Sequence, residues 1–235
     1  MKRQLFSADQ TERIGMTGIK AVFFDMDGVL IDTEKYYHIC WRQALEEAGF
    51  QPTTEQVLCL RSCSRPYGIP LLHSFFGEGC DYDQIRKRRK ELMAPMLEKE
   101  GIQMKPGADQ AVRMLRERGY QTVVVTASDL ERTTKYLGEV GMLDAFDHLV
   151  CASMVETGKP APDIYRYALR VSGFRPEEVI ALEDSDNGIR SAAGADLKTI
   201  FVPDLSGPNE ESAARILYLA KDLPDAVRFI CADEQ

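Results

Sequence analysis

The sequence predicts an α/β fold in which a parallel sheet is interrupted by an inserted, all-helical segment. Two observations indicate this class. Short apolar segments rich in β-branched residues alternate with segments of helical spacing over most of the chain. The alternation stops after the first apolar segment, and residues 35 to 104 contain no convincing strand.

Five segments are predicted to be strands. Each is bounded by charged residues, Gly or Pro, and each is apolar at almost every position, as expected for strands buried on both faces. They are residues 19–24, 121–126, 148–152, 178–183 and 198–202. The helical segments between the later strands place these strands parallel to one another.

Four segments with helical periodicity lie before and between the later strands. They cover residues 108–119, 128–141, 161–173 and 187–195. The second opens with Ser128 and Glu131 in the spacing of a capping box, which predicts the start of a helix at this point.

The inserted interval has helical patterns of its own. Residues 35–50 place apolar side chains on one helical face, namely Tyr37, Trp41, Ala44, Leu45 and Ala48. Residues 81–101 predict a second helix, interrupted at Pro95. We therefore expect an N-terminal extension (1–18), a core made of 19–34 and 105–235, and a helical domain (35–104).

The composition narrows the class of protein. The chain has 235 residues, of which 28% are charged, and its net charge is -8. This acidic balance disfavours a nucleic-acid partner. Six cysteines without a C-x-x-C pair predict reduced thiols, and no segment has the pattern of a signal peptide or a membrane span. We expect a cytoplasmic protein with no membrane partner and no obligate protein partner.

Polar residues follow several of the predicted strands. Asp25 and Asp27 follow the first, Thr126 ends the second, and Glu183 and Asp184 end the fourth. Parallel strands bring their carboxyl ends to one edge of the sheet, where open α/β sheets bind ligands. Lys159, which follows the third strand, is expected at the same edge.

Four carboxylates in one small volume require a cation. Two unit charges ~4 Å apart interact by roughly 4 kcal/mol at an effective dielectric constant near 20. Oxygen ligands without a neighbouring Cys or His favour Mg²⁺. A threonine hydroxyl and a lysine beside this ion suit the oxygens of a phosphoryl group.

Four ordered motifs resemble those of the haloacid dehalogenase superfamily. They are "DMDGVLIDT" (25–33), "TAS" (126–128), "GKPAPD" (158–163) and "EDSDNG" (183–188). The insertion is similar to the helical cap of the β-phosphoglucomutase and phosphoglycolate phosphatase relatives. The resemblance implies a Rossmann-like core, an Mg²⁺ cofactor and phosphoryl transfer through an aspartyl phosphate.

The resemblance also implies roles for individual residues. Asp25 would be the nucleophile, and Asp27 the general acid and base. Mg²⁺ would be bound by Asp25, the backbone carbonyl of Asp27, Asp184 and Glu183. The phosphoryl oxygens would be bound by Thr126, Ala127, Ser128 and Lys159. A general acid is needed for an alkoxide leaving group but not for halide, so Asp27 points to phosphate esters.

The same relatives include phosphatases and phosphosugar mutases. Arg65 and Arg89 occupy the places of two cationic residues of the mutase cap, and we expect both to bind substrate. Tyr37 replaces a mutase histidine, and Asp129 stands where the mutase has a lysine facing a second phosphate. These two differences favour a phosphatase of a small phosphorylated metabolite, with a mutase as the alternative.

Other interpretations remain open at this stage. The basic run of residues 86–90 is typical of a solvated helix face. A signalling receiver domain uses similar acidic and phosphate-binding residues but lacks a large helical insertion. A non-catalytic phosphate-binding module would be favoured if Asp25 or Asp184 were replaced, and neither is.

Overall fold

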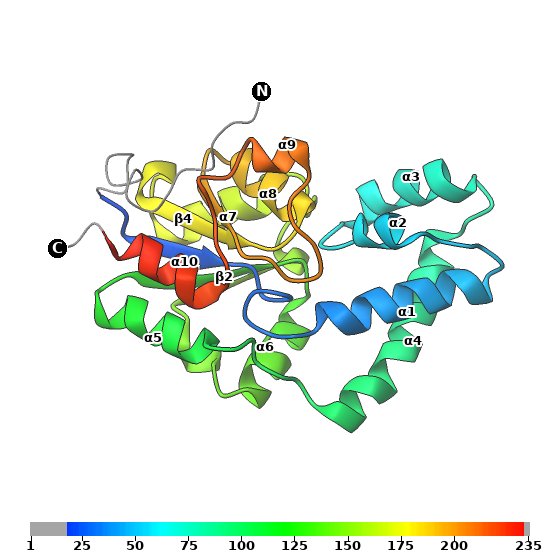
Figure 1. Ribbon diagram of the computed structural model, residues 1–235, viewed down its shortest axis with the longest axis horizontal. Helices are drawn as coiled ribbons and strands as arrows, with labels where there is room; N and C mark the ends of the chain where they lie inside the picture. Colours follow the sequence, from blue (N-terminus) through cyan, green and yellow to red (C-terminus); the bar gives the residue numbers. More distant parts are fainter. Residues whose placement is uncertain (1–17, 233–235) are drawn as a thin grey trace.

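A six-stranded parallel sheet lies at the centre of the computed structural model, which describes residues 18–232 (Figure 1). The strand order is β3-β2-β1-β4-β5-β6. The strands are β1 (Ala21–Phe24), β2 (Gln121–Thr126), β3 (His148–Cys151), β4 (Val179–Glu183), β5 (Lys198–Phe201) and β6 (Tyr218–Leu219). The predicted α/β class with a Rossmann-like parallel sheet is confirmed. The predicted extension lies outside the described residues, apart from Gly18.

Helices cover both faces of the sheet. Side chains of β1 alternate between two apolar clusters: Val22 and Phe24 belong to one, Ala21 and Phe23 to the other. The first cluster includes α5 (Ala108–Glu117), α6 (Leu130–Glu139) and α10 (Leu223–Ile230). The second includes α7 (Asp163–Ser172) and α8 (Asp186–Ala193). Burial on both faces explains why the strand segments are apolar throughout.

The insertion forms a lobe beside the sheet (Figure 1). It contains α1 (Glu34–Glu47), α2 (Thr54–Leu58), α3 (Arg65–Phe76) and α4 (Tyr82–Glu100), which share an apolar cluster of their own. The two connections to the sheet run side by side. The backbone N–H of Asp32 donates to Gln103 (2.8 Å), and that of Lys105 donates to Leu30 (2.9 Å). Both connections leave from the edge of the sheet that carries the strand-end acids.

Three local predictions need correction. Helix α4 continues through Pro95, because packing of its buried side chains against α1 offsets the lost hydrogen bond. Helix α6 is capped by the Asp129 carboxylate, which accepts from the Arg132 N–H (2.9 Å), and Ser128 instead turns toward Asp27. Strand β6 was missed because two edge residues give no period-two pattern.

Four short helical turns complete the described chain. They are η2 (Leu143–Ala145), η3 (Ala152–Met154), η4 (Pro176–Glu178) and α9 (Glu210–Ala213). Within residues 18–232, none of the helices combines the length and the apolar character that crossing a bilayer requires.

Candidate active site

The register of the sheet brings the strand-end residues together. Phe24 of β1 pairs with Val124 of β2 and with Leu182 of β4. The next residue of each strand therefore lies at the same level, which places Asp25 between Val125 and Glu183. The Asp25 N–H donates to the carbonyl of Leu182 (2.9 Å), which extends the β1–β4 pairing to the aspartate itself.

Gly28 lets the chain turn directly beside the acids. Its φ of +89° lies in the left-handed region, which glycine adopts without strain. A Cβ at this position would overlap the carboxylate of Asp184. The "DMDG" turn can therefore approach the end of β4 only with glycine at its fourth position.

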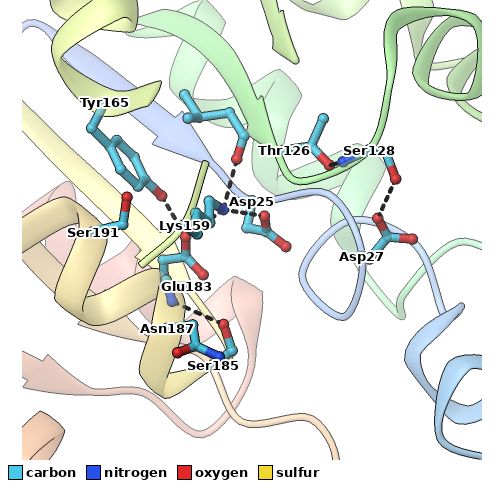
Figure 2. Close-up of polar contacts among 12 residues, drawn as sticks. Asp25, Asp27, Thr126, Ser128, Lys159, Tyr165, Glu183, Ser185, Asn187 and Ser191 are labelled. Carbon is cyan, nitrogen blue, oxygen red and sulfur yellow. Dashed lines mark hydrogen bonds and ion pairs between the residues drawn. The ribbon is translucent and has the colours of Figure 1, made fainter. Parts of the chain in front are cut away.

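Lys159 is the cation at the centre of the acidic group (Figure 2). Its side chain is 0% exposed, and its ammonium donates to Asp25 Oδ1, to Glu183 Oε1 (2.6 Å) and to the Val125 carbonyl (2.9 Å). Tyr165 of α7 also donates to Glu183 Oε1 (2.6 Å). Although burial opposes it, the carboxylates of Asp25 and Glu183 raise the pKa of the Lys159 ammonium.

Among the contacts of residues 18–232, three carboxylates around Lys159 each keep one buried oxygen without a hydrogen-bond partner. These atoms are Asp25 Oδ2, Glu183 Oε2 and Asp184 Oδ1. The three residues can each offer one oxygen to a common ion, with these ligand atoms within 4.8 Å of one another. A set of hard, anionic oxygens in a buried site fits a divalent cation such as Mg²⁺.

Electrostatics supports the same assignment. Burial raises the pKa of Asp25 well above its ordinary value, and Glu183 and Asp184 raise it further while Lys159 lowers it. Burial also raises the pKa of Asp184 to about 7, with Arg61 opposing and Glu183 adding to the shift. The neighbouring cations therefore neutralise only part of the negative charge of these carboxylates. A divalent ion would relieve the remaining repulsion among them.

Asp27 lies beside the cluster, where the sheet faces the helical lobe. Its carboxylate accepts hydrogen bonds from the Thr33 hydroxyl and from the Ser128 hydroxyl (3.1 Å), as Figure 2 shows for Ser128. Burial raises the pKa of Asp27, whereas the hydrogen bond from Thr33 lowers it. Two donors on different segments hold this carboxyl in one orientation, which suits a group that exchanges protons with a substrate.

The predicted phosphoryl-binding residues lie around the same point. Thr126 ends β2 fully buried, and its hydroxyl oxygen accepts from the Ser128 N–H (3.0 Å). Ala127 and Ser128 line a pocket between the sheet edge and the helical lobe, together with Asp27. The structure thus gathers Asp25, Asp27, Thr126, Ala127, Ser128, Lys159, Glu183 and Asp184 from four strand ends.

The lobe contributes different residues than the motif comparison suggested. Arg89 lines the pocket, but Arg65 does not: it lies exposed at the start of α3 and pairs with Asp83. Arg61, four residues earlier, is buried and contacts Asp184 Oδ2 (3.1 Å) and the Ser206 hydroxyl (2.7 Å). The loop between α2 and α3 thus reaches the core through Arg61.

Sequence reasoning missed several residues near the site. Thr33 and Tyr165 hydrogen-bond the acidic residues, and Asp204, after β5, lies beside Gly28 and acts electrostatically on Asp184. Glu34 is buried in the pocket with Oε2 unpartnered. Thr33 is the last residue of the first motif, so the motif could have identified it. The others carry no local signal, because their proximity depends on how distant segments fold together.

Comparisons with known proteins identify the family. A family model described as haloacid dehalogenase-like hydrolase matches residues 19–196. This chain belongs to that family. The resemblance inferred from the four motifs is therefore confirmed, as is the expectation that the chain is an enzyme of this superfamily.

The proteins similar to this hydrolase include a phosphatase, a phosphosugar mutase and the protein CbbY. Phosphorylated carbohydrates phosphatase of Thermotoga maritima is 27% identical over 187 residues, covering 78% of this chain and 84% of the relative. Beta-phosphoglucomutase of Bacillus subtilis is 25% identical over 192 residues, covering 78% and 83%. The crystal structure of CbbY from Rhodobacter sphaeroides in complex with phosphate is similar with a TM-score of 0.69 and 26% identity, covering 88% of this chain and 96% of that chain.

Proposed function

We propose that this hydrolase is a magnesium-dependent phosphatase that removes phosphate from a small phosphorylated metabolite. The observation that carries the proposal is the set of three unpartnered carboxylate oxygens beside the buried Lys159 ammonium. Asp25, Glu183, Asp184 and the backbone carbonyl of Asp27 would hold the ion. When bound, Mg²⁺ would neutralise the acidic cluster and draw charge from the phosphoryl oxygens. The names of the relatives support a sugar phosphate or a similar ester.

Asp25 is the proposed nucleophile. One of its oxygens attacks phosphorus, the bond from phosphorus to the ester oxygen breaks, and an aspartyl phosphate forms. Lys159 neutralises one Asp25 oxygen, and from this position it and the buried Thr126 would bind the phosphoryl oxygens. Burial of Asp25 and Lys159 keeps water from screening this interaction.

Asp27 is the proposed general acid and base. The departing ester oxygen takes a proton from Asp27, which burial helps to keep protonated by raising its pKa. A water then attacks the phosphorus of the aspartyl phosphate and gives its proton to Asp27. The bond between phosphorus and Asp25 breaks, inorganic phosphate leaves, and both aspartates return to their starting states.

Phosphate release tests this proposal. The purified protein should release inorganic phosphate from p-nitrophenyl phosphate or from sugar phosphates in Mg²⁺, and EDTA should stop it. Asp25→Asn should abolish turnover with an unchanged circular dichroism spectrum, whereas the exposed control Asp144→Asn should turn over normally. Turnover by Asp25→Asn at the wild-type rate would refute the nucleophile assignment.

A phosphosugar mutase is the second candidate. Two sequence differences argued against it: Tyr37 replaces a mutase histidine, and an Asp129 carboxylate would repel a second phosphate. In the structure the Asp129 carboxylate caps α6 and does not line the pocket, which removes the second objection, whereas Tyr37 lines the pocket and the first objection stands. Conversion of β-glucose 1-phosphate to glucose 6-phosphate in Mg²⁺ would favour the mutase, and release of inorganic phosphate alone would favour the phosphatase. No observation on the described residues favours a signalling or non-catalytic module.

A further inference from the structure

The loop that follows β5 carries a carboxylate that the proposed mechanism does not use. The Val202 N–H donates to the Glu183 carbonyl (2.8 Å), so the pairing of β4 with β5 continues to the level of the acidic cluster. Asp204 follows two residues later, and its side chain is only 6% exposed. The sheet thus brings a further buried acid to the edge that carries Asp25, Glu183 and Asp184.

The two oxygens of Asp204 have different surroundings. Oδ1 accepts a hydrogen bond from the ammonium of Lys105 (2.6 Å), which lies in the connection from α4 back to the sheet. Oδ2 is buried and has no hydrogen-bond partner among residues 18–232. Lys105 therefore holds the carboxylate through one oxygen and leaves the other as an acceptor. A buried acceptor without a protein donor indicates that a water or an ion belongs beside it.

The unpartnered oxygen of Asp204 lies next to a proposed metal ligand. Oδ2 is 3.2 Å from the position that a Cβ on Gly28 would occupy, and the carboxylate of Asp184 lies against the same position. The two carboxylates are therefore neighbours, and Asp204 helps to raise the pKa of Asp184, to which burial contributes most. Within residues 18–232, the hydrogen bonds of the Arg61 guanidinium go to Asp184 and Ser206, which leaves Oδ2 of Asp204 without this donor.

Asp204 is not placed to share the ion directly. In the described chain, the carboxylates that can offer oxygens to one ion are those of Asp25, Glu183 and Asp184. Mg²⁺ prefers an octahedral set of ligands and usually keeps several water molecules among them. Groups just outside the ligand set accept hydrogen bonds from such ligands and thereby orient them. The position of Asp204 suits this outer role.

We propose that Asp204 is a positioning residue of the magnesium site, where its Oδ2 accepts a hydrogen bond from a water molecule bound to the ion. This inference rests on the proposed function and adds to its metal site a residue that lies in none of the four motifs. The hydrogen bond satisfies Oδ2 and places negative charge near the ion. It also links the ion to the helical lobe, because Lys105 approaches Asp32 in the other connection (3.9 Å) while it holds Asp204.

Titration calorimetry with MgCl₂ and the purified full-length protein tests the inference. Asp204→Asn keeps the shape of the side chain, and its affinity for Mg²⁺ should fall about tenfold to a hundredfold, with one ion bound per chain as in the wild type. Asp184→Asn removes a ligand and should bind Mg²⁺ more weakly still. Glu178→Gln is the matched control, because Glu178 also pairs with a lysine (2.7 Å) but precedes β4, at the opposite end of the strands. It should bind Mg²⁺ like the wild type.

A double variant separates the hydrogen bond from the charge. Asp204→Asn combined with Lys105→Gln removes both charges of the buried pair, so it leaves neither an uncompensated charge nor a change in net charge. It should keep the wild-type circular dichroism spectrum and lose as much Mg²⁺ affinity as Asp204→Asn alone. A double variant with wild-type affinity would show that only the altered charge matters, which would refute the hydrogen bond.

The remaining outcomes are also decisive. Wild-type affinity in Asp204→Asn, even with a lowered unfolding temperature, would make Asp204 a purely structural partner of Lys105 and overturn the inference. A loss as complete as that of Asp184→Asn, or a fall from two bound ions to one, would identify Asp204 as a direct ligand and overturn it equally. If the wild type neither binds Mg²⁺ nor releases phosphate from any ester, the proposed function fails and the inference falls with it.

Discussion

Replacing Lys159 by methionine tests the electrostatics of the acidic cluster. Methionine has a similar length but lacks the ammonium that donates to Asp25, Glu183 and the Val125 carbonyl. The carboxylates of Asp25 and Glu183 would then face each other in a fully buried site without the cation between them. This is the removal of one partner from a buried ion pair, which leaves uncompensated charge.

The expected loss of stability is large. Removing one partner of a buried pair lowers the free energy of unfolding by about 3–5 kcal/mol. For a domain of this size each kcal/mol lowers Tm by about 2–4 °C, so the melting temperature should fall by roughly 6–20 °C. Asp25 can bind a proton to limit the loss, since burial already raises its pKa. With a raised pKa in the folded state, the variant should lose more stability at pH 8 than at pH 6.

Thermal unfolding followed by circular dichroism measures the effect, at both pH values and with either EDTA or Mg²⁺. Mg²⁺ should raise the Tm of Lys159→Met more than that of the wild type, because it supplies the missing positive charge. Lys87→Met, an exposed lysine on α4, is the matched control and should melt like the wild type. An equal Tm for Lys159→Met and Lys87→Met in EDTA at pH 8 would refute the account of the cluster.

Two further predictions concern the surroundings of the acids. In Gly188→Ala the new Cβ would overlap the Glu183 carboxylate and displace it. Titration calorimetry should therefore show that the affinity for Mg²⁺ falls about tenfold or more. The control Gly138→Ala, which has open space around the new Cβ, should bind Mg²⁺ like the wild type. Hydrogen bonds from Lys20 and then from the Arg175 backbone and side chain lower the pKa of Glu178 to about 2. Its stabilisation is therefore present above pH 4.5 and lost as the pH falls toward 2. The Tm difference between wild type and Glu178→Gln should be constant above pH 5 and vanish near pH 2, and a pH-independent difference would contradict this assignment.

The chemistry at the strand ends was predictable from sequence. Asp25, Thr126 and Glu183 each directly follow or end an apolar segment, and a parallel sheet necessarily aligns such positions along one edge. Lys159 was expected at the same edge because it follows the third predicted strand, and the structure shows it in contact with Asp25. These positions are encoded locally, so a one-dimensional pattern was sufficient to find them.

The helical lobe was less predictable. Two of its helices, α1 and α4, were expected individually, whereas α2 and α3 were not. Arg65 was expected in the pocket and lies exposed, while Arg61 of the lobe and Arg132 of α6 were not expected and line it. Arg61 lies in the loop between α2 and α3, and a loop has no periodic pattern from which the direction of a side chain could be predicted. Asp129 precedes α6 as its N-cap, and its carboxylate accepts from the Arg132 N–H instead of lining the pocket.

The amino-acid sequence by itself determined the family, the parallel sheet and the acids at its edge, because each depends on short patterns of apolar and charged residues. Only the tertiary structure decided which oxygens stay unpartnered around Lys159 and which arginines meet above Asp27. Those contacts join residues that lie far apart in the chain. Their geometry comes from the packing of the helical lobe against the sheet, which no local pattern encodes.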